Sequence, residues 1–196
     1  PSSFKVAKAL SVGAVATLVL VACGGGGGGG GGTTLASDQT LKFPILGDFG
    51  TLDPAQLNAE TDSEIAQNMF DGLVKFDNNL NIVPDIASAM PTVSSDGLTY
   101  TFKLRQDVTF SNGDKVTSAD VLYSWNRAAA LHGAYSTNLS AIVGFSDVQT
   151  AAGKAPKKTE GQTAIQTFRQ NIETHLANHD SAFMMSGLKA MDPYTV

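Results

Sequence analysis

The chain has 196 residues, of which 42% are hydrophobic and 16% charged, and its formal net charge is −5. This acidic balance argues against a nucleic-acid-binding protein, because neutralising phosphates requires clustered Lys and Arg side chains. The single cysteine, Cys23, excludes a disulfide within the chain.

A signal peptide is predicted at residues 1–22. Lys5 and Lys8 precede an apolar run at 9–22, which gives a positive start, a short apolar middle and a small residue before the cleavage site. The run is shorter than the roughly 20 apolar residues that a membrane-spanning helix requires. Cleavage would remove the two lysines and no acidic residue, so the formal charge would become −7. We therefore expect an exported, acidic mature chain.

Residues 23–40 are predicted to form a lipidated cysteine and a tether. Residues 20–23, Leu-Val-Ala-Cys, resemble the lipobox of bacterial lipoproteins, in which the cysteine takes a diacylglycerol thioether and becomes the first mature residue. The unbroken glycine run at 24–32 is typical of a flexible linker. We expect Cys23 to anchor the protein to the cell membrane, facing the periplasm or the cell exterior, since two acyl chains give stable attachment.

The first part of the predicted domain, residues 41–196, contains strand, helix and hairpin patterns. Residues 41–46 are a short apolar strand candidate. Thr61 with Glu64 three residues later has the pattern of a capping box, and apolar residues at helical spacing predict a helix over 62–73. Asp77-Asn78-Asn79 separates 73–76 from 81–83 and predicts a β-hairpin that ends at Pro84.

Further strands and turns follow in the middle of the chain. After a predicted turn at Asp96-Gly97, the residues Leu98, Tyr100, Phe102 and Leu104 alternate with polar residues, as in a strand with one buried face. Asn112-Gly113 predicts another tight turn. Short strands mixed with separate helices indicate a mixed fold class, α+β or irregular α/β.

Two longer helices are predicted in the second half of the chain. Thr117 is expected to cap the first of them, with Asp120 in its first turn, where the helix dipole favours a carboxylate. Its inward stripe is predicted to contain Val121, Leu122, Trp125 and either Ala128 or Ala129. A surface loop is predicted at 153–161, and after it Ile165, Phe168, Ile172 and Leu176 recur at helical spacing.

The two ends of the sequence lead us to expect a fragment. The chain begins with Pro1 in place of Met, and residues 192–196 combine a turn with the start of a strand-like run that has no evident partner in the sequence. Residues 41–196 are therefore expected to form part of a domain.

A series of motifs in fixed order resembles the extracytoplasmic solute-binding proteins of family 5. The motifs are Leu52-Asp53-Pro54-Ala55 and residues 68–74, 96–105, 110–114, 116–121 and 123–127, with 192–196 as a later element. Each motif is weak alone, whereas their joint order over 41–145 is specific. Residues 151–185 depart from the family pattern and resemble an insertion.

The resemblance implies a fold, a function and partners. Proteins of this family have two lobes of the periplasmic-binding-protein type II fold, which close on a ligand and deliver it to an ABC permease driven by a separate ATPase. Members take peptides, nickel chelates, haem or oligosaccharides, and a peptide is the ligand expected here. This chain would be the N-terminal part, roughly the first third, of a monomeric binding protein without cofactor or catalysis.

The resemblance also assigns candidate ligand-binding residues. In peptide-binding relatives the loop after the Leu-Asp-Pro motif runs beside the ligand backbone and pairs with it as a strand would. That loop corresponds to Asn58, Ala59 and Glu60. A tyrosine that lines the cleft in such relatives corresponds to Tyr135.

For three residues a structural role is the alternative to contact with a ligand. Tyr135 would then cover the end of a helix. Asp53, which precedes Pro54, is expected to form a turn. Trp125 lies on an apolar helical stripe and is expected to pack in the core.

Two other classes of function are alternatives. His175 and His179 are four residues apart on a predicted helix, as in a zinc-dependent hydrolase. Zinc proteases with this spacing have glutamate after the first histidine, where this chain has Leu176, so half-buried packing is the better account and no metal is expected. A structural surface lipoprotein would have the same tether. We find no Ser/His/Asp or Cys/His pattern typical of a hydrolase.

Overall fold

The computed structural model describes residues 38, 40, 42–45 and 47–196. Cys23, the predicted signal peptide and most of the predicted tether lie outside these residues. The chain divides into two compact units, residues 1–43 and 44–196. In the described part of the first unit, the Thr40 N–H donates to the Asp38 carboxylate at 2.9 Å. Residues 42–45, which fall in the strand predicted at 41–46, have no regular secondary structure, so that prediction is wrong for them.

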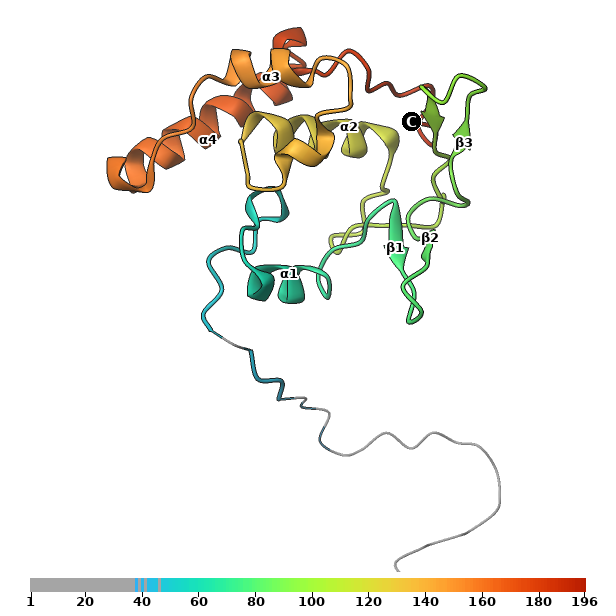
Figure 1. The fold of residues 1–196 in the computed structure, drawn as a ribbon, viewed down its shortest axis with the longest axis horizontal. Coiled ribbons are helices and arrows are strands. Elements are labelled where there is room, and N and C mark those ends of the chain that lie inside the picture. Colours follow the sequence, from blue (N-terminus) through green and yellow to red (C-terminus); the bar gives the residue numbers. More distant parts are fainter. Residues whose placement is uncertain (1–37, 39, 41, 46) are drawn as a thin grey trace, which may run out of the picture. The chain divides into compact units, whose positions relative to one another are not determined.

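In the second unit, two helices pack against α2 (Ser118–Ala130). α3 (Phe145–Ala152) and α4 (Gln162–Ala177) both contact α2, as Figure 1 shows. The buried apolar residues between these helices and the segment after α4 are Ala129, Ala130, Leu131, Phe145, Val148, Ala152, Ile172, Leu176, Phe183 and Met185. Residues 151–185, which resemble an insertion in sequence, therefore contribute to the main core.

α2 has the start that the sequence predicts, and α4 buries residues of its predicted stripe. At the start of α2, the Asp120 carboxylate accepts hydrogen bonds from the Thr117 N–H at 2.7 Å and from its hydroxyl at 2.8 Å. In α4, Ile172 and Leu176 are 0% and 1% exposed. The predicted surface loop at 153–161 is mostly exposed and contains one short 3₁₀ turn, η3 (Lys158–Glu160).

α1 (Glu60–Ala66) is shorter than the helix predicted at 62–73 and begins earlier. Ala59 occupies the N-cap position, so the capping box predicted from Thr61 and Glu64 is wrong. Met69 and Phe70, whose spacing would continue the helix, are 56% and 45% exposed. Without burial of these side chains, packing provides little free energy to extend the helix.

The first predicted hairpin is confirmed. β1 (Val74–Phe76) pairs antiparallel with β2 (Ile82–Pro84), and Lys75 lies opposite Val83. In the turn, the Asp77 carboxylate accepts from the backbone N–H groups of Asn79 and Asn81. Leu80 takes the left-handed conformation, with φ 63°, in place of one of the asparagines.

The strand predicted at 98–104 forms only in part. β4 (Tyr100–Thr101) pairs with β3 (Thr92–Val93), while Leu98 is 82% exposed and Tyr100 57% exposed, so the prediction of one continuous buried face is wrong. Leu104 is buried, in a second core cluster with Leu73, Ala87 and Val121.

The last residues of the chain pair with the segment that follows β4. Phe102 and Val196 exchange backbone hydrogen bonds of 2.9 and 3.0 Å, and the Leu104 N–H donates to the Tyr194 carbonyl at 2.8 Å. The expectation that this run has no partner is therefore wrong. A link between segments about 90 residues apart leaves no local pattern in the sequence.

The remaining elements are tight turns and short 3₁₀ helices. Gly113, with φ 92°, forms the predicted turn at Asn112-Gly113, where the Phe110 N–H donates to the Asp114 carbonyl. The other 3₁₀ helices are η1 (Pro54–Gln56), η2 (Ser136–Leu139) and η4 (Ser181–Phe183). The mixed helix and strand content confirms the predicted fold class. Among the described residues, no helix has the length and apolar character needed to cross a bilayer.

Candidate functional site

The candidate ligand loop follows directly after η1, and Asp53 starts that short helix. The Asp53 carboxylate accepts a hydrogen bond from the Ala55 N–H at 3.0 Å, and Pro54 occupies the first helical position. Proline suits this position because its fixed φ matches a helix and its missing N–H would have no partner there. The predicted turn-forming role of Asp53 is confirmed.

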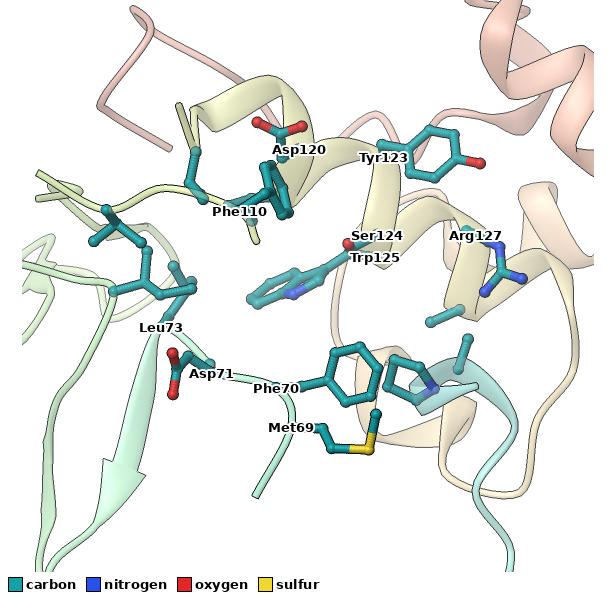
Figure 2. A pocket seen from close by; sticks show the side chains of 18 of the residues that line it. Met69, Phe70, Asp71, Leu73, Phe110, Asp120, Tyr123, Ser124, Trp125 and Arg127 are labelled. Atoms are coloured by element: carbon teal, nitrogen blue, oxygen red, sulfur yellow. The ribbon is translucent and has the colours of Figure 1, made fainter. Parts of the chain in front are cut away.

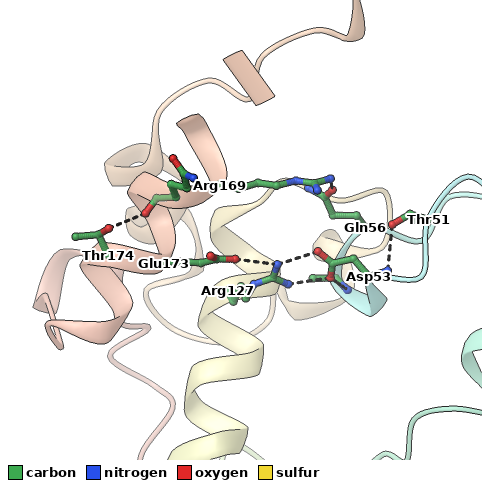
Figure 3. Close-up of polar contacts among 9 residues, drawn as sticks. Thr51, Asp53, Gln56, Arg127, Arg169, Glu173 and Thr174 are labelled. Carbon is green, nitrogen blue, oxygen red and sulfur yellow. Dashed lines mark hydrogen bonds and ion pairs between the residues drawn. The ribbon is translucent and has the colours of Figure 1, made fainter. Parts of the chain in front are cut away.

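Asp53 also joins η1 to α2 and α4 through Arg127 (Figure 3). Two guanidinium nitrogens of Arg127 donate to the two oxygens of Asp53, each at 2.8 Å, and one donates to Glu173 on α4 at 3.3 Å. Burial by itself would raise the pKa of Asp53, but the hydrogen bonds and charge of Arg127 outweigh it and lower that pKa. The same bonds raise the pKa of Arg127 above its ordinary value.

Two further contacts fix η1 in place. Arg169 on α4 donates a hydrogen bond to the side chain of Gln56, as Figure 3 shows. Gly133 packs so tightly on η1 that a Cβ atom there would lie 2.1 Å from the Ala55 carbonyl oxygen. This close approach requires glycine at position 133.

The three predicted ligand residues Asn58, Ala59 and Glu60 lie where the chain leaves η1 and enters α1. Asn58 and Glu60 are exposed and Ala59 is half-buried. Ala59 has an extended backbone, with φ −131° and ψ 157°, whereas Glu60 is the first residue of α1. A strand-like contact with a ligand backbone can therefore involve Asn58 and Ala59 but ends at Glu60.

The conformation of this loop depends on Asp62, whose carboxylate is completely buried. It accepts hydrogen bonds from the N–H groups of Gly50 at 2.6 Å, Thr51 at 3.5 Å and Asn58 at 3.3 Å. These backbone donors, Gly50 first, hold the pKa of Asp62 below its ordinary value. Asp62 was not among the predicted site residues, because the wrong choice of N-cap hid its place three residues after Ala59.

Tyr135, the fourth predicted ligand residue, lies at the N-cap position of η2 with 52% of its surface exposed. It stands two residues after Gly133, the residue that packs on η1. The segments that carry Tyr135 and Asn58 therefore meet at the contact between Gly133 and Ala55. Tyr135 therefore stands at the start of η2, and about half of its surface remains accessible.

An apolar pocket of about 710 Å³ lies on α2 (Figure 2). Trp125 points into it from α2, with Phe70 and Leu73 nearby from the segment after α1 and Phe110 from the turn before α2. Trp125 also packs against both core clusters, which confirms its predicted core role. The pocket-lining residues 69–73, 110–111 and 123–125 fall within motifs of the family resemblance, although the motifs alone do not predict a pocket.

The predicted ligand residues are absent from the lining of this pocket, which η1 reaches through Pro54 and Ala55. Arg127 lines the pocket and binds Asp53. The three candidate ligand residues thus follow the C-terminal end of η1. The apolar pocket lies beside Pro54 and Ala55, at the start of the same short helix.

The two histidines of the zinc hypothesis have different surroundings. His175 Nδ1 lies 2.7 Å from an Asp180 carboxylate oxygen, and its ring stacks on Phe183 at 4.3 Å between centroids. These contacts confirm half-buried packing for His175. His179 lies beyond the end of α4 (Gln162–Ala177), is exposed and has a left-handed backbone with φ 53°, so half-buried packing is wrong for this residue. In the part of the chain that the structure describes, no three metal-binding side chains cluster together.

Comparison with known families gives one match that covers more than half of the chain. Residues 81–196 match the model described as bacterial extracellular solute-binding proteins, family 5 Middle. The matched region includes β2, the turn at Asn112-Gly113, and α2 to α4.

Curated relatives match a larger share of the sequence. A dipeptide-binding protein of Lactococcus lactis is 34% identical over 159 residues, which cover 76% of this chain and 27% of the relative. The oligopeptide-binding protein AliB of Streptococcus pneumoniae is 29% identical over 184 residues, which cover 91% of this chain and 23% of the relative. The chain thus spans about a quarter of the length of these relatives.

One solved structure shows the same fold over most of this chain. The crystal structure of Haemophilus influenzae OppA in complex with the peptide RPPGFSPFR matches with a TM-score of 0.50 at 24% identity. The match covers 74% of this chain and 23% of that one.

Proposed function

The chain belongs to family 5 of the bacterial extracellular solute-binding proteins, and from this we propose that it is the N-terminal part of a two-lobed protein that captures peptides for an ABC importer. The family match over residues 81–196 is the observation that carries the proposal. The relatives from Lactococcus lactis and Streptococcus pneumoniae are named as dipeptide-binding and oligopeptide-binding proteins. These names favour a peptide over other solutes as the ligand.

Binding by such a protein follows from closure of two lobes. A ligand that contacts both lobes only when they are shut shifts the population towards the closed form, and the permease can distinguish this form from the open one. In this proposal the part described here provides one wall of the cleft. A wall must keep its shape when the ligand leaves, and η1 suits this role because Arg127, Arg169 and Gly133 hold it.

The ligand contacts in this proposal come from Asn58, Ala59, Glu60 and Tyr135. Backbone contacts from the loop would be tolerant of peptide sequence, because every peptide offers the same amide groups. The exposed ring of Tyr135 would add an apolar face and a hydroxyl. Lipidation of Cys23, attachment to the membrane and delivery to permease subunits belong to the same proposal.

Titration of the full-length gene product with tri-alanine tests the proposal by isothermal calorimetry. We expect a Kd of about 10 μM or tighter, and no binding of free alanine, nickel–histidine, haem or maltotriose under the same conditions. Binding of one of those solutes in place of the peptide would contradict the peptide assignment. Absence of binding to every one of them would favour the structural surface lipoprotein.

A pair of tyrosine variants then tests the site. Tyr135→Ala should weaken tri-alanine binding about five- to tenfold, because a hydroxyl and an apolar face are lost from the cleft wall. Tyr100→Ala is the matched control, since Tyr100 is 57% exposed, close to the 52% of Tyr135, but lies on β4. Equal affinities for the two variants would remove Tyr135 from the site.

A further inference from the structure

Asp62 is a buried charge whose partners are backbone groups. Asp62 is 0% exposed, and within the described chain no Lys, Arg or His side chain forms an ion pair with it. A buried carboxylate without hydrogen bonds is costly, so a protein keeps one only where donors surround it. Here the donors are main-chain N–H groups from two segments.

These donors bring two separate loops together at the start of α1. Gly50 and Thr51 belong to the loop before η1, and Asn58 belongs to the loop after it. The Ala59 N–H also stabilises the carboxylate, as expected for an acidic side chain three residues after an N-cap. One side chain therefore orients the backbone on both sides of η1.

The contacts that fix η1 end before the ligand loop begins. Arg127 holds Asp53, Gly133 packs on Ala55, and Arg169 binds Gln56. Beyond these three contacts, the backbone N–H of Asn58 donates to the Asp62 carboxylate. The direction in which the loop leaves η1 thus depends on this carboxylate.

We propose that Asp62 is a positioning residue for ligand binding, which holds the backbone of Asn58 and Ala59 in the conformation that meets the ligand. This inference rests on the proposed function of the loop. Asp62 itself has no exposed surface and does not touch the ligand. Its carboxylate holds the N–H of Asn58, which limits the conformations that the backbone of this loop can adopt.

Amide hydrogen exchange measures the positioning directly and without a ligand. In Asp62→Asn the negative charge is lost and an amide group faces the backbone donors. We expect the N–H groups of Gly50 and Asn58 to exchange at least about tenfold faster than in the unaltered protein, because their local opening becomes easier. Unchanged exchange at both positions would overturn the inference.

Affinity for tri-alanine, measured on the same full-length gene product, then tests the consequence. Asp62→Asn should weaken binding about tenfold, since the loop must be ordered again whenever a ligand binds. Asp62→Ser, which also removes the charge, should have the same effect and serves where the first variant folds poorly. Unchanged affinity together with faster exchange would overturn the inference.

Two control variants separate positioning from a general loss of stability. Asp77→Asn removes a carboxylate that also accepts backbone N–H groups, at 2.8 and 2.9 Å, but in the β1–β2 turn. Asn126→Ala removes a buried amide that accepts from the Met185 N–H. Both should keep their affinity within about twofold. If Asn126→Ala lost as much affinity as Asp62→Asn, general destabilisation would replace positioning as the explanation.

Failure of the proposed function gives a different result from failure of the inference. A protein that binds no tri-alanine even without substitution refutes both the peptide function and the positioning that depends on it. A protein that binds tri-alanine equally well with and without the Asp62 carboxylate refutes the positioning alone.

Discussion

At the scale of single residues, two carboxylates near the ligand loop are stabilised in different ways. Asp53 has a guanidinium partner, Arg127, whereas Asp62 has backbone N–H partners. Both carboxyl groups have lowered pKa values, so each contributes stability that is present above its unfolded pKa and is lost as the pH falls through its folded pKa. The stability of the fold and the conformation of the candidate ligand loop thus depend on the same ionised groups.

Replacing Arg127 should show the size of the first interaction. Its ion pair with Asp53 is bidentate, and the two side chains are 17% and 19% exposed. Arg127→Met should therefore lower the free energy of unfolding by about 2–3 kcal/mol at pH 7, because the carboxylate loses its charged partner. Urea unfolding followed by circular dichroism measures the change.

Acid pH and a second arginine serve as controls for this prediction. The difference between Arg127→Met and the unaltered chain should shrink as the pH falls below the ordinary Asp value of 3.8, since Asp53 becomes protonated. Arg105 makes a bidentate pair with Asp107, but those side chains are 47% and 72% exposed. Arg105→Met should change stability far less. A loss that does not depend on pH would point to packing of the Arg127 stem.

At the scale of elements, the sequence predicts those whose signals are local. The β1–β2 hairpin follows from Asp77 and its neighbours, and the start of α2 follows from Thr117 and Asp120. The length of α1 and the burial of residues 98–104 depend on which segments meet, so periodicity alone gives the wrong result. α3 was not predicted at all, and its N-cap is Gly144 with φ 89°, which offers no side-chain cap.

The candidate site was predictable in the same uneven way. The family resemblance assigns Asn58, Ala59, Glu60 and Tyr135, and their contact with a ligand stays a prediction. The pair of Asp53 with Arg127 joins residues 74 positions apart, a separation that no repeat or spacing marks in the sequence. A buried Asp62 likewise depends on a loop 12 residues away.

The role of α4 can be tested through one core residue. Leu176 is 1% exposed and belongs to the main core cluster, although it lies in the segment 151–185 that resembles an insertion. Leu176→Ala should lower the free energy of unfolding by about 2–5 kcal/mol, through lost burial and the cavity left behind. Trp125 is the single tryptophan of the chain and lies on α2. Its fluorescence therefore reports the urea concentration at which α2 unfolds, which should fall in Leu176→Ala if α2 and α4 unfold together.

The matched variant on the same stripe is Ile165→Ala, because Ile165 is half-buried. It should cost less than Leu176→Ala, in proportion to the smaller apolar area removed from water. An unchanged Trp125 transition in Leu176→Ala would mean that α4 unfolds separately, as an appended insertion would.

At the scale of the whole molecule, the proposed function needs two parts that work independently. The second unit, residues 44–196, contains the candidate ligand loop and its supports, and the predicted anchor lies at Cys23. Attachment at Cys23 would keep the binding protein near a permease in the same membrane, which raises its effective concentration there.

Substitution of Cys23 separates attachment from binding. The thiol is the predicted acylation site. Cys23→Ser should therefore move the protein from the membrane fraction to the soluble fraction and remove the acyl mass from its N-terminal peptide in mass spectrometry. Affinity for tri-alanine should stay within about twofold, because no predicted ligand contact involves the anchor. Ser37→Ala, in the same predicted tether, should stay membrane-bound, and retention of Cys23→Ser in the membrane would contradict lipid anchoring at this residue.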